Sequence, residues 1–302
     1  MPVFMKKFEE LETRYLNPLT DFGFHRIFGE ESNKDLLMDF LNEIIKEEGW
    51  ISDIQYLVSE QWGNSKTDRK AVFDIFCKTE KGEYFIVEMQ NAKQPFFRDR
   101  SIFYTSIPIQ KQAPKGVWNF QLKAVYLVAI LDFILFNEHE EDKKYVVERV
   151  QLVRERTKTV YSNKLNFAFV ELPKFRKTEE ELKTNFDKWL FLLKNLPELK
   201  DRPALIRGKI FEKLFKLVEV KRLTEEDMER YNKSILEYQD VRSAMDCARE
   251  EALEEGREEG IKKEKNAIIQ KSLQMNIPIE VIIELTGYSK EQIIHYKVNE
   301  AL

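Results

Sequence analysis

Two acidic residues, Asp74 and Glu88, stand in two apolar runs that are separated by the segment Glu80–Gly82. A three-residue loop that ends in glycine is typical of a β-hairpin, because its last position usually needs a positive φ. If Lys81 is the centre of the turn, each residue pairs with its mirror image about Lys81. This register predicts that Asp74 lies opposite Glu88.

Side chains alternate across a strand, so Asp74 and Glu88 should share one face of the hairpin, with Cβ atoms about 4.5–5.5 Å apart. The same register pairs Val72 with Gln90. Facing like charges destabilise a sheet, and burial of a lone carboxylate is costly. Such a pair is stable if it shares a proton, recruits a basic residue or binds a hard cation, and Mg²⁺ prefers one or two carboxylates with water and phosphate oxygens. The alternative is an exposed face on which both acids are solvated beside nearby lysines.

The elements around this hairpin follow the order α–β–β–β–α–β–β–β. Apolar residues at helical spacing predict a helix over 34–48, after a short apolar stretch at 17–28. Short runs rich in Val, Ile, Phe and Tyr predict six strands, with a helix over 96–112 between the third and the fourth. The strands are expected over 51–59, 69–78, 83–90, 122–131, 145–154 and 166–171. This order predicts an α/β domain, a mixed sheet flanked by helices.

The chain becomes helical after Pro173. Helices are expected over 179–196, 204–220, 224–265, 279–285 and 290–295. We therefore expect two domains, a catalytic one over 1–200 and a helical C-terminal region over 201–302 that contributes little to the active site. The charged run 246–265 is read as a solvated helix, with an acidic docking surface as the alternative.

Composition excludes several classes of protein. The 49 basic and 53 acidic residues give a net charge of −4, so any contact with nucleic acid must come from a local basic patch. Two cysteines and three histidines argue against a disulfide framework or a zinc cluster. The most apolar run, Ala124–Phe136, is shorter than the roughly 20 residues of a membrane span, and Met1–Glu10 lacks the apolar segment of a signal peptide. We expect a soluble protein of the reducing cytoplasm that does not bind membranes.

Three further stretches accompany the acid pair in a fixed order along the chain: Pro18–Gly29, Phe97–Tyr104 and Gln274–Ser289. Together with Asp74 and the run Glu88–Gln90, they resemble the PD-(D/E)XK nuclease superfamily, and specifically its family of recombination-promoting nucleases and transposases. The likeness extends from about residue 15 to 295. It implies a restriction-endonuclease-like fold.

The resemblance also implies roles for single residues. Asp74 and Glu88 become metal ligands, and the carbonyl of Met89 completes the metal shell. Gln90 is the third catalytic residue, and it stands where the wider superfamily has Lys; glutamine can orient a water molecule but carries no charge. Asp21 is implied as an outer-shell acid, and its alternative role is to cap the turn after Thr20.

The chemistry implied is hydrolysis of DNA phosphodiester bonds with Mg²⁺ or Mn²⁺, by an endonuclease of recombination or transposition. Residues 91–124 contain six basic side chains and one acid. The helix over 96–112 would place Arg98, Arg100 and Lys111 along the DNA backbone, with Tyr104 as a further contact. The alternatives are a solvated amphipathic helix, and packing for Tyr104.

A second hypothesis is a catalytically silent DNA-binding or assembly protein that retains the nuclease fold. The intact residues Asp74, Glu88 and Gln90 favour the enzyme, because a binding protein has no need of an acid pair. The C-terminal hairpin resembles a helix-turn-helix. Its last helix, over 290–295, is short and weakly charged, so packing or formation of a homodimer through the helical region is the preferred interpretation.

Overall fold

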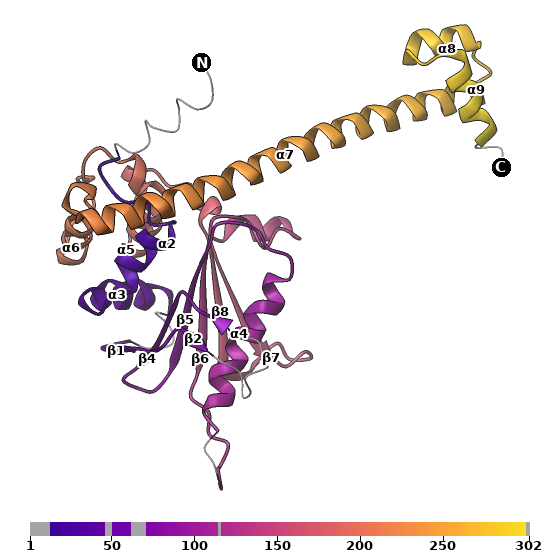
Figure 1. Ribbon diagram of the computed structural model, residues 1–302. Helices are drawn as coiled ribbons and strands as arrows, with labels where there is room; N and C mark the ends of the chain where they lie inside the picture. The colour runs from indigo at the N-terminus through magenta and orange to yellow at the C-terminus, as the bar shows by residue number, and fades with distance from the viewer. Residues whose placement is uncertain (1–12, 46–49, 62–70, 114–115, 300–302) are drawn as a thin grey trace. The chain divides into compact units, whose positions relative to one another are not determined.

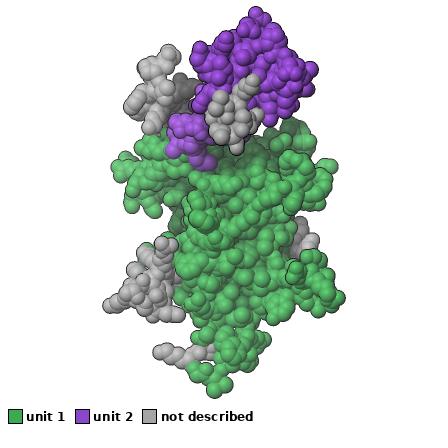
Figure 2. Space-filling view, turned by 90° about the vertical axis from the view of Figure 1, so that its right-hand side faces the viewer, with its two compact units in different colours: residues 1–242 green, residues 243–302 purple. Residues whose placement is uncertain are grey.

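The computed structural model describes residues 13–45, 50–61, 71–113 and 116–299. The chain forms two compact units, one up to Arg242 and one from Ser243 (Figure 2). The contacts thus divide the chain within the long helix α7 (Glu225–Gln274) rather than near residue 200. The reason is burial, because helix α6 (Lys209–Leu217) and the start of α7 place Phe211, Leu214 and Tyr231 in the core of the first unit.

The first unit contains a six-stranded mixed sheet. Strands β5, β6 and β8 run parallel to one another, while β1, β4 and β7 pair antiparallel with their neighbours. In spatial order the strands are β1 (Ile54–Tyr56), β4 (Ile75–Thr79), β5 (Tyr84–Gln90), β6 (Val125–Leu131), β8 (Val160–Glu171) and β7 (Val147–Val153). A separate two-stranded sheet joins β2 (Glu60–Gln61) and β3 (Ala71–Val72).

Helices cover both faces of this sheet (Figure 1). On one face α2 (Asp21–Phe28), α3 (Lys34–Ile44), α5 (Asn185–Asn195) and α6 share a large core with the start of α7; on the other face lies α4 (Phe97–Lys111). Strand β5 shows why both faces are covered, since Phe85 and Val87 enter the first core and Ile86 enters the second. Every residue of β6 is buried, as predicted for a central strand. The expected mixed sheet with flanking helices is confirmed.

Short 3₁₀ segments complete the first unit. They are η3 (Glu31–Asn33), η4 (Glu140–Lys144), η5 (Leu172–Lys174), η6 (Glu179–Glu181), η7 (Leu196–Glu198) and η8 (Val220–Arg222).

The second unit is helical, as expected. The end of α7 packs with α8 (Ile279–Thr286) and α9 (Lys290–Asn299) around Ile269, Ile282 and Ile293. Gly287 ends α8 in the left-handed conformation, with φ 69°. Across the helices that the structure describes, none is long and apolar enough to cross a bilayer.

Deletion analysis tests the division into units. A chain that ends at Arg242 should fold and unfold cooperatively. A chain that ends at residue 200 should not fold, because loss of a large buried side chain costs about 2–5 kcal/mol and several are lost together, against a total stability of about 5–15 kcal/mol. Thermal melts followed by circular dichroism measure both. A cooperative melt of the shorter chain would show that α6 and α7 are dispensable for the fold.

Candidate active site

The β4–β5 hairpin has the predicted register. Its pairs run from Ile75 with Val87 to Lys78 with Tyr84, so each residue faces its mirror image about Lys81. The turn closes with Gly82 at φ 83°, the positive φ that the sequence predicts for its last position.

The preceding strand is shorter than expected over 69–78. A bend at Asp74 separates β3 from β4, and Val72 pairs with Glu60 of the small sheet. The predicted pairing of Val72 with Gln90 is therefore wrong. The physical reason is Phe73, which breaks the alternation to bury its ring against Phe76, with 5.3 Å between ring centroids and 1% of Phe73 exposed. Residues 69 and 70 lie outside the described part of the chain.

The bend brings Asp74 next to Glu88, as the register predicts. The N–H of Asp74 donates a hydrogen bond to Glu88 Oε1 at 3.4 Å, and the N–H of Met89 donates to Asp74 Oδ2 at 2.7 Å. Gln90 Nε2 donates to Glu88 Oε2 at 3.3 Å. The four residues that the resemblance singles out thus form one hydrogen-bonded cluster.

The two carboxyl groups differ in how they meet solvent. Glu88 is 3% exposed, and burial, followed by the charge of Asp74, raises the pKa of Glu88 to about 8. Asp74 reaches solvent through an open cavity, but the loss of water around its carboxyl group still raises the pKa of that group to about 6. The charge of Arg100 lowers the pKa of both groups without cancelling either shift. Near neutral pH the pair therefore tends to retain a proton, which a cation could replace.

These residues fit a hard divalent cation. Two carboxylates and a carbonyl are oxygen donors of the type Mg²⁺ prefers. In an extended strand the N–H and C=O of one residue point to the same side, so the carbonyl of Met89 points toward the edge where its N–H meets Asp74. No group of three or more His, Cys, Asp or Glu side chains is arranged for a metal among the residues described. Water and phosphate oxygens would complete the shell.

Helix α4 brings two of its predicted DNA-binding residues to the pair. Arg100 acts electrostatically on both carboxyl groups, and its guanidinium lies 5.5 Å from the ring centroid of Tyr104. Tyr104 packs edge-on against Phe73 at 5.1 Å, and burial, then the charge of Glu88, raises its pKa. Lys111 follows on the same helical face at the other end of α4.

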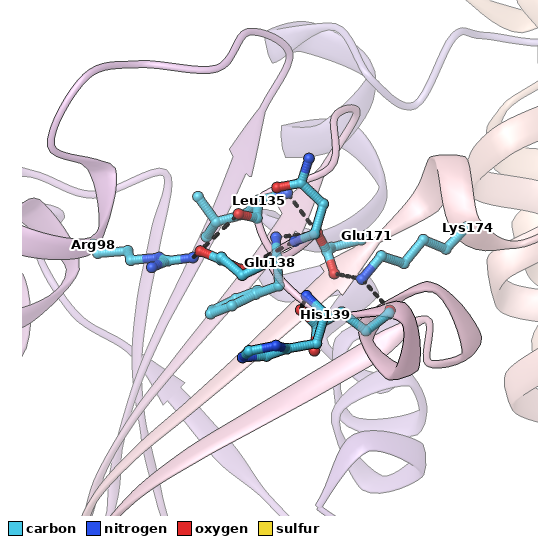
Figure 3. A network of polar contacts seen from close by, with 9 residues as sticks. Arg98, Leu135, Glu138, His139, Glu171 and Lys174 are labelled. Carbon is cyan, nitrogen blue, oxygen red and sulfur yellow. Dashed lines mark hydrogen bonds and ion pairs between the residues drawn. The ribbon is translucent and has the colours of Figure 1, made fainter.

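Arg98 points elsewhere. Its guanidinium donates to the carbonyl of Leu135 at 3.2 Å, forms an ion pair with Glu138 at 2.5 Å and lies 4.5 Å from the ring centroid of Phe136 (Figure 3). Arg98 thus ties α4 to the loop after β6.

Sequence reasoning missed Glu171, which holds that loop in place. Glu171 is fully buried at the end of β8, and its Oε1 accepts hydrogen bonds from the N–H groups of Leu135 and Phe136 at 2.5 and 3.0 Å. Its Oε2 lies 2.5 Å from Nζ of Lys174 (Figure 3). The signal was an acid at the end of an apolar strand, followed three residues later by a lysine.

A cavity of about 450 Å³ opens beside Asp74. Asp21 lines it too, and the charge of Asp21 contributes to the raised pKa of Asp74. Burial, then the charge of Glu237, raises the pKa of Asp21 itself. The N-cap of α2 is Thr20, whose Oγ1 accepts from the N–H of Gly23 at 3.0 Å.

Helix α7 forms a wall of this cavity. Arg230, Lys233 and Glu237 line it, so the expectation that residues after about 200 contribute little to the site is wrong. The same helix reaches the end of β6, where Asp132 accepts from Arg242 Nη1 at 2.7 Å. The N–H of Asp132 donates to the carbonyl of Gln90 at 3.0 Å, which links α7 to the acid cluster. The sequence predicts a helix in this region, but it does not indicate that this helix lies beside Asp74.

The arrangement can be compared with known proteins. The model of the PD-(D/E)XK nuclease family transposases matches residues 18–248. The chain belongs to this family. The match spans the sheet, the acid pair and the start of α7, and it agrees with the resemblance read from the sequence. No curated protein and no solved structure gives a significant match. In a member of the PD-(D/E)XK family, a mixed sheet with flanking helices is consistent with the restriction-endonuclease-like fold. The family implies a nuclease-related function with DNA as substrate. Nucleases of this kind typically use divalent metals.

The pKa of Glu88 predicts how stability changes with pH when EDTA removes divalent ions. Because its folded-state pKa lies above the ordinary 4.5, the folded chain binds more protons than the unfolded chain between about pH 4.5 and 8. Stability should therefore fall as pH rises through that range. In Glu88→Gln the fall in Tm across this pH range should be smaller by a few degrees. Each kcal/mol of unfolding free energy shifts Tm by about 2–4 °C in a chain of this size.

The matched control for this experiment is Glu155→Gln, at an exposed position of the same unit. Differential scanning fluorimetry across the pH range measures all three proteins. An identical pH profile for wild type and Glu88→Gln would contradict the raised pKa.

Proposed function

We propose that the protein is an Mg²⁺-dependent DNA endonuclease, also active with Mn²⁺, that hydrolyses phosphodiester bonds in recombination or transposition. The observation that carries this proposal is the pairing of Asp74 with Glu88, a nearly buried carboxyl group beside a second one that opens onto a cavity. An acid pair held together against its own repulsion is well suited to a hard cation.

Each residue of the cluster has a role in this proposal. Asp74, Glu88 and the Met89 carbonyl would hold the cation. Its chemistry when bound is to polarise the phosphate, lower the pKa of a bound water and neutralise the leaving oxygen. Gln90 orients the attacking water, since its amide is already fixed by the hydrogen bond to Glu88. Arg100 offsets negative charge that develops on the phosphate.

The remaining predicted residues act around this centre. We assign Asp21 as an outer-shell acid, on the evidence that it lines the same cavity as Asp74. Arg100, Tyr104 and Lys111 would follow the DNA backbone along α4. Arg98 contributes mainly by fixing the loop that holds Glu138, and it contacts DNA only if that ion pair opens.

We also propose that two chains pair through the second unit. Its helices leave Val281, Leu285 and Ile294 exposed by 41%, 58% and 44%. The chain that ends at Arg242 should then be monomeric by light scattering, whereas the full chain should be dimeric. A monomeric full chain would contradict this pairing.

Catalysis is tested by nicking of supercoiled plasmid with and without Mg²⁺. Asp74→Ala and Glu88→Ala should reduce nicking to background, because one carboxylate alone holds a hard cation poorly. Gln90→Ala should slow nicking by about 10–100-fold, the usual effect of losing a group that orients a metal-bound ligand. Its metal binding, read as the Mg²⁺-dependent increase in Tm, should remain.

One control and two contrary outcomes make the experiment decisive. The exposed substitution Glu155→Gln should leave nicking unchanged. Undiminished nicking by Asp74→Ala would place the active site elsewhere. Absence of nicking in every form, with no effect of Mg²⁺ on Tm, would favour the catalytically silent binding protein.

A further inference from the structure

Hydrogen bonds hold helix α7, one wall of the cavity beside Asp74, in place. The N–H of Phe22 in α2 donates to Ser234 Oγ of α7 at 3.2 Å, and the N–H of Asn17 donates to the Tyr231 hydroxyl at 2.9 Å. Farther along α7, Nη1 of Arg242 donates to Asp132 Oδ2 at 2.7 Å. These bonds fix α7 at several points along the site, so the wall cannot easily move to enlarge the cavity.

The size of the cavity restricts what can enter. About 450 Å³ lies in the range of sites for small ligands, which is about 300–1,000 Å³. A nucleotide fits such a volume, whereas a double helix, whose major groove alone is about 12 Å wide, does not. A DNA strand that continues from Asp74 into this cavity must therefore be unpaired there.

Two basic side chains of α7 are available to a phosphate. Arg230 is 63% exposed, with its closest described acid, Asp227, at 4.0 Å; Lys233 is 79% exposed and lies 3.8 Å from Glu237. Exposed ion pairs of this kind contribute at most about 1 kcal/mol, so an entering phosphate displaces them at little cost.

Arg26 is less available, because it is paired with Glu30 at 2.9 Å and lies 3.7 Å from Asp227. Five acidic side chains line the cavity against three lysines and arginines, so its lining is net acidic; the acids are Asp21, Glu30, Asp74, Asp227 and Glu237. The cavity can therefore hold few phosphates, and another interaction must contribute to binding.

Phe22 supplies that interaction. Its half-buried ring lines the cavity and packs against Tyr231, with 5.9 Å between the ring centroids. The guanidinium of Arg230 lies over this ring at 5.7 Å from its centroid, so a base that stacks there takes the place of Arg230, which is then free to meet a phosphate. An aromatic ring beside basic groups is the combination by which proteins bind single-stranded nucleic acids, since bases stack on the ring while the phosphates meet the charges.

We propose that this cavity binds an unpaired nucleotide next to the phosphate that is cut, through Phe22, Arg230 and Lys233. The inference rests on the proposed function and narrows its substrate to DNA with a single-stranded end or flap. It assigns to α7 a role in substrate choice.

Fluorescence anisotropy in EDTA tests binding without cleavage. The probes are a labelled duplex with a short single-stranded overhang and the same duplex with blunt ends. Wild type should bind the overhang more tightly. The double variant R230A/K233A should lose that preference, and the salt dependence of its overhang binding should decrease by about 1.4 in log–log slope for the two lost phosphate contacts. The matched control R207A/K216A removes the same charges from exposed positions outside the cavity and should behave as wild type.

Phe22→Leu keeps an apolar side chain but removes the ring. It should weaken overhang binding by about 5- to 100-fold, with little change for the blunt duplex and a Tm close to wild type. Phe22→Trp should restore the preference. This pair separates stacking from a general loss of structure.

Cleavage of the two duplexes with Mg²⁺ separates this inference from the proposed function. Cleavage without an overhang preference, or equal behaviour of R230A/K233A and its control, would overturn the inference and leave the nuclease standing. An overhang preference in binding that depends on Arg230, Lys233 and Phe22, without cleavage of any DNA, would support the cavity and overturn the nuclease.

Discussion

Repulsion between the carboxyl groups of Asp74 and Glu88 is the constraint around which this end of the sheet is built. Glu88 is almost fully buried, so its charge is costly unless a proton or a cation accompanies it. The structure lowers that cost only in part, through the N–H of Asp74, the side-chain amide of Gln90 and the charge of Arg100. The remaining cost is the physical basis for proposing that the pair binds a cation.

The fold holds this pair in place through aromatic packing on one face of the sheet and through contacts at the ends of its strands. On one face, Phe73 and Phe76 pack beneath Tyr104 of α4, which fixes the bend that carries Asp74. Parallel strands end at the same edge, and the buried Glu171 uses that geometry to hold the loop after β6. The edge of the sheet that carries the candidate active site is therefore formed by elements that lie far apart in the sequence.

Much of the site could be read from the sequence because it is local. The glycine in the turn and the alternation of apolar residues were sufficient to predict the β4–β5 register, and that register, continued into the bend before β4, leaves Asp74 beside Glu88. The prediction failed at Val72, because the burial of Phe73 outweighed regular pairing. The local sequence pattern does not indicate how much free energy is gained when an aromatic ring is buried at the expense of the regular strand alternation.

The sequence by itself determined the hairpin, the acid pair, the central strand β6 and the family. The tertiary structure alone decided that α7 lines the cavity, that Arg98 turns away to Glu138, and that the first unit extends to Arg242. The physical reason is how far apart in the sequence the interacting residues lie. Turn conformation and strand alternation depend on neighbours a few residues apart, whereas the position of α7 depends on contacts such as Arg242 with Asp132, which join segments more than 100 residues apart and exist only once the sheet has formed.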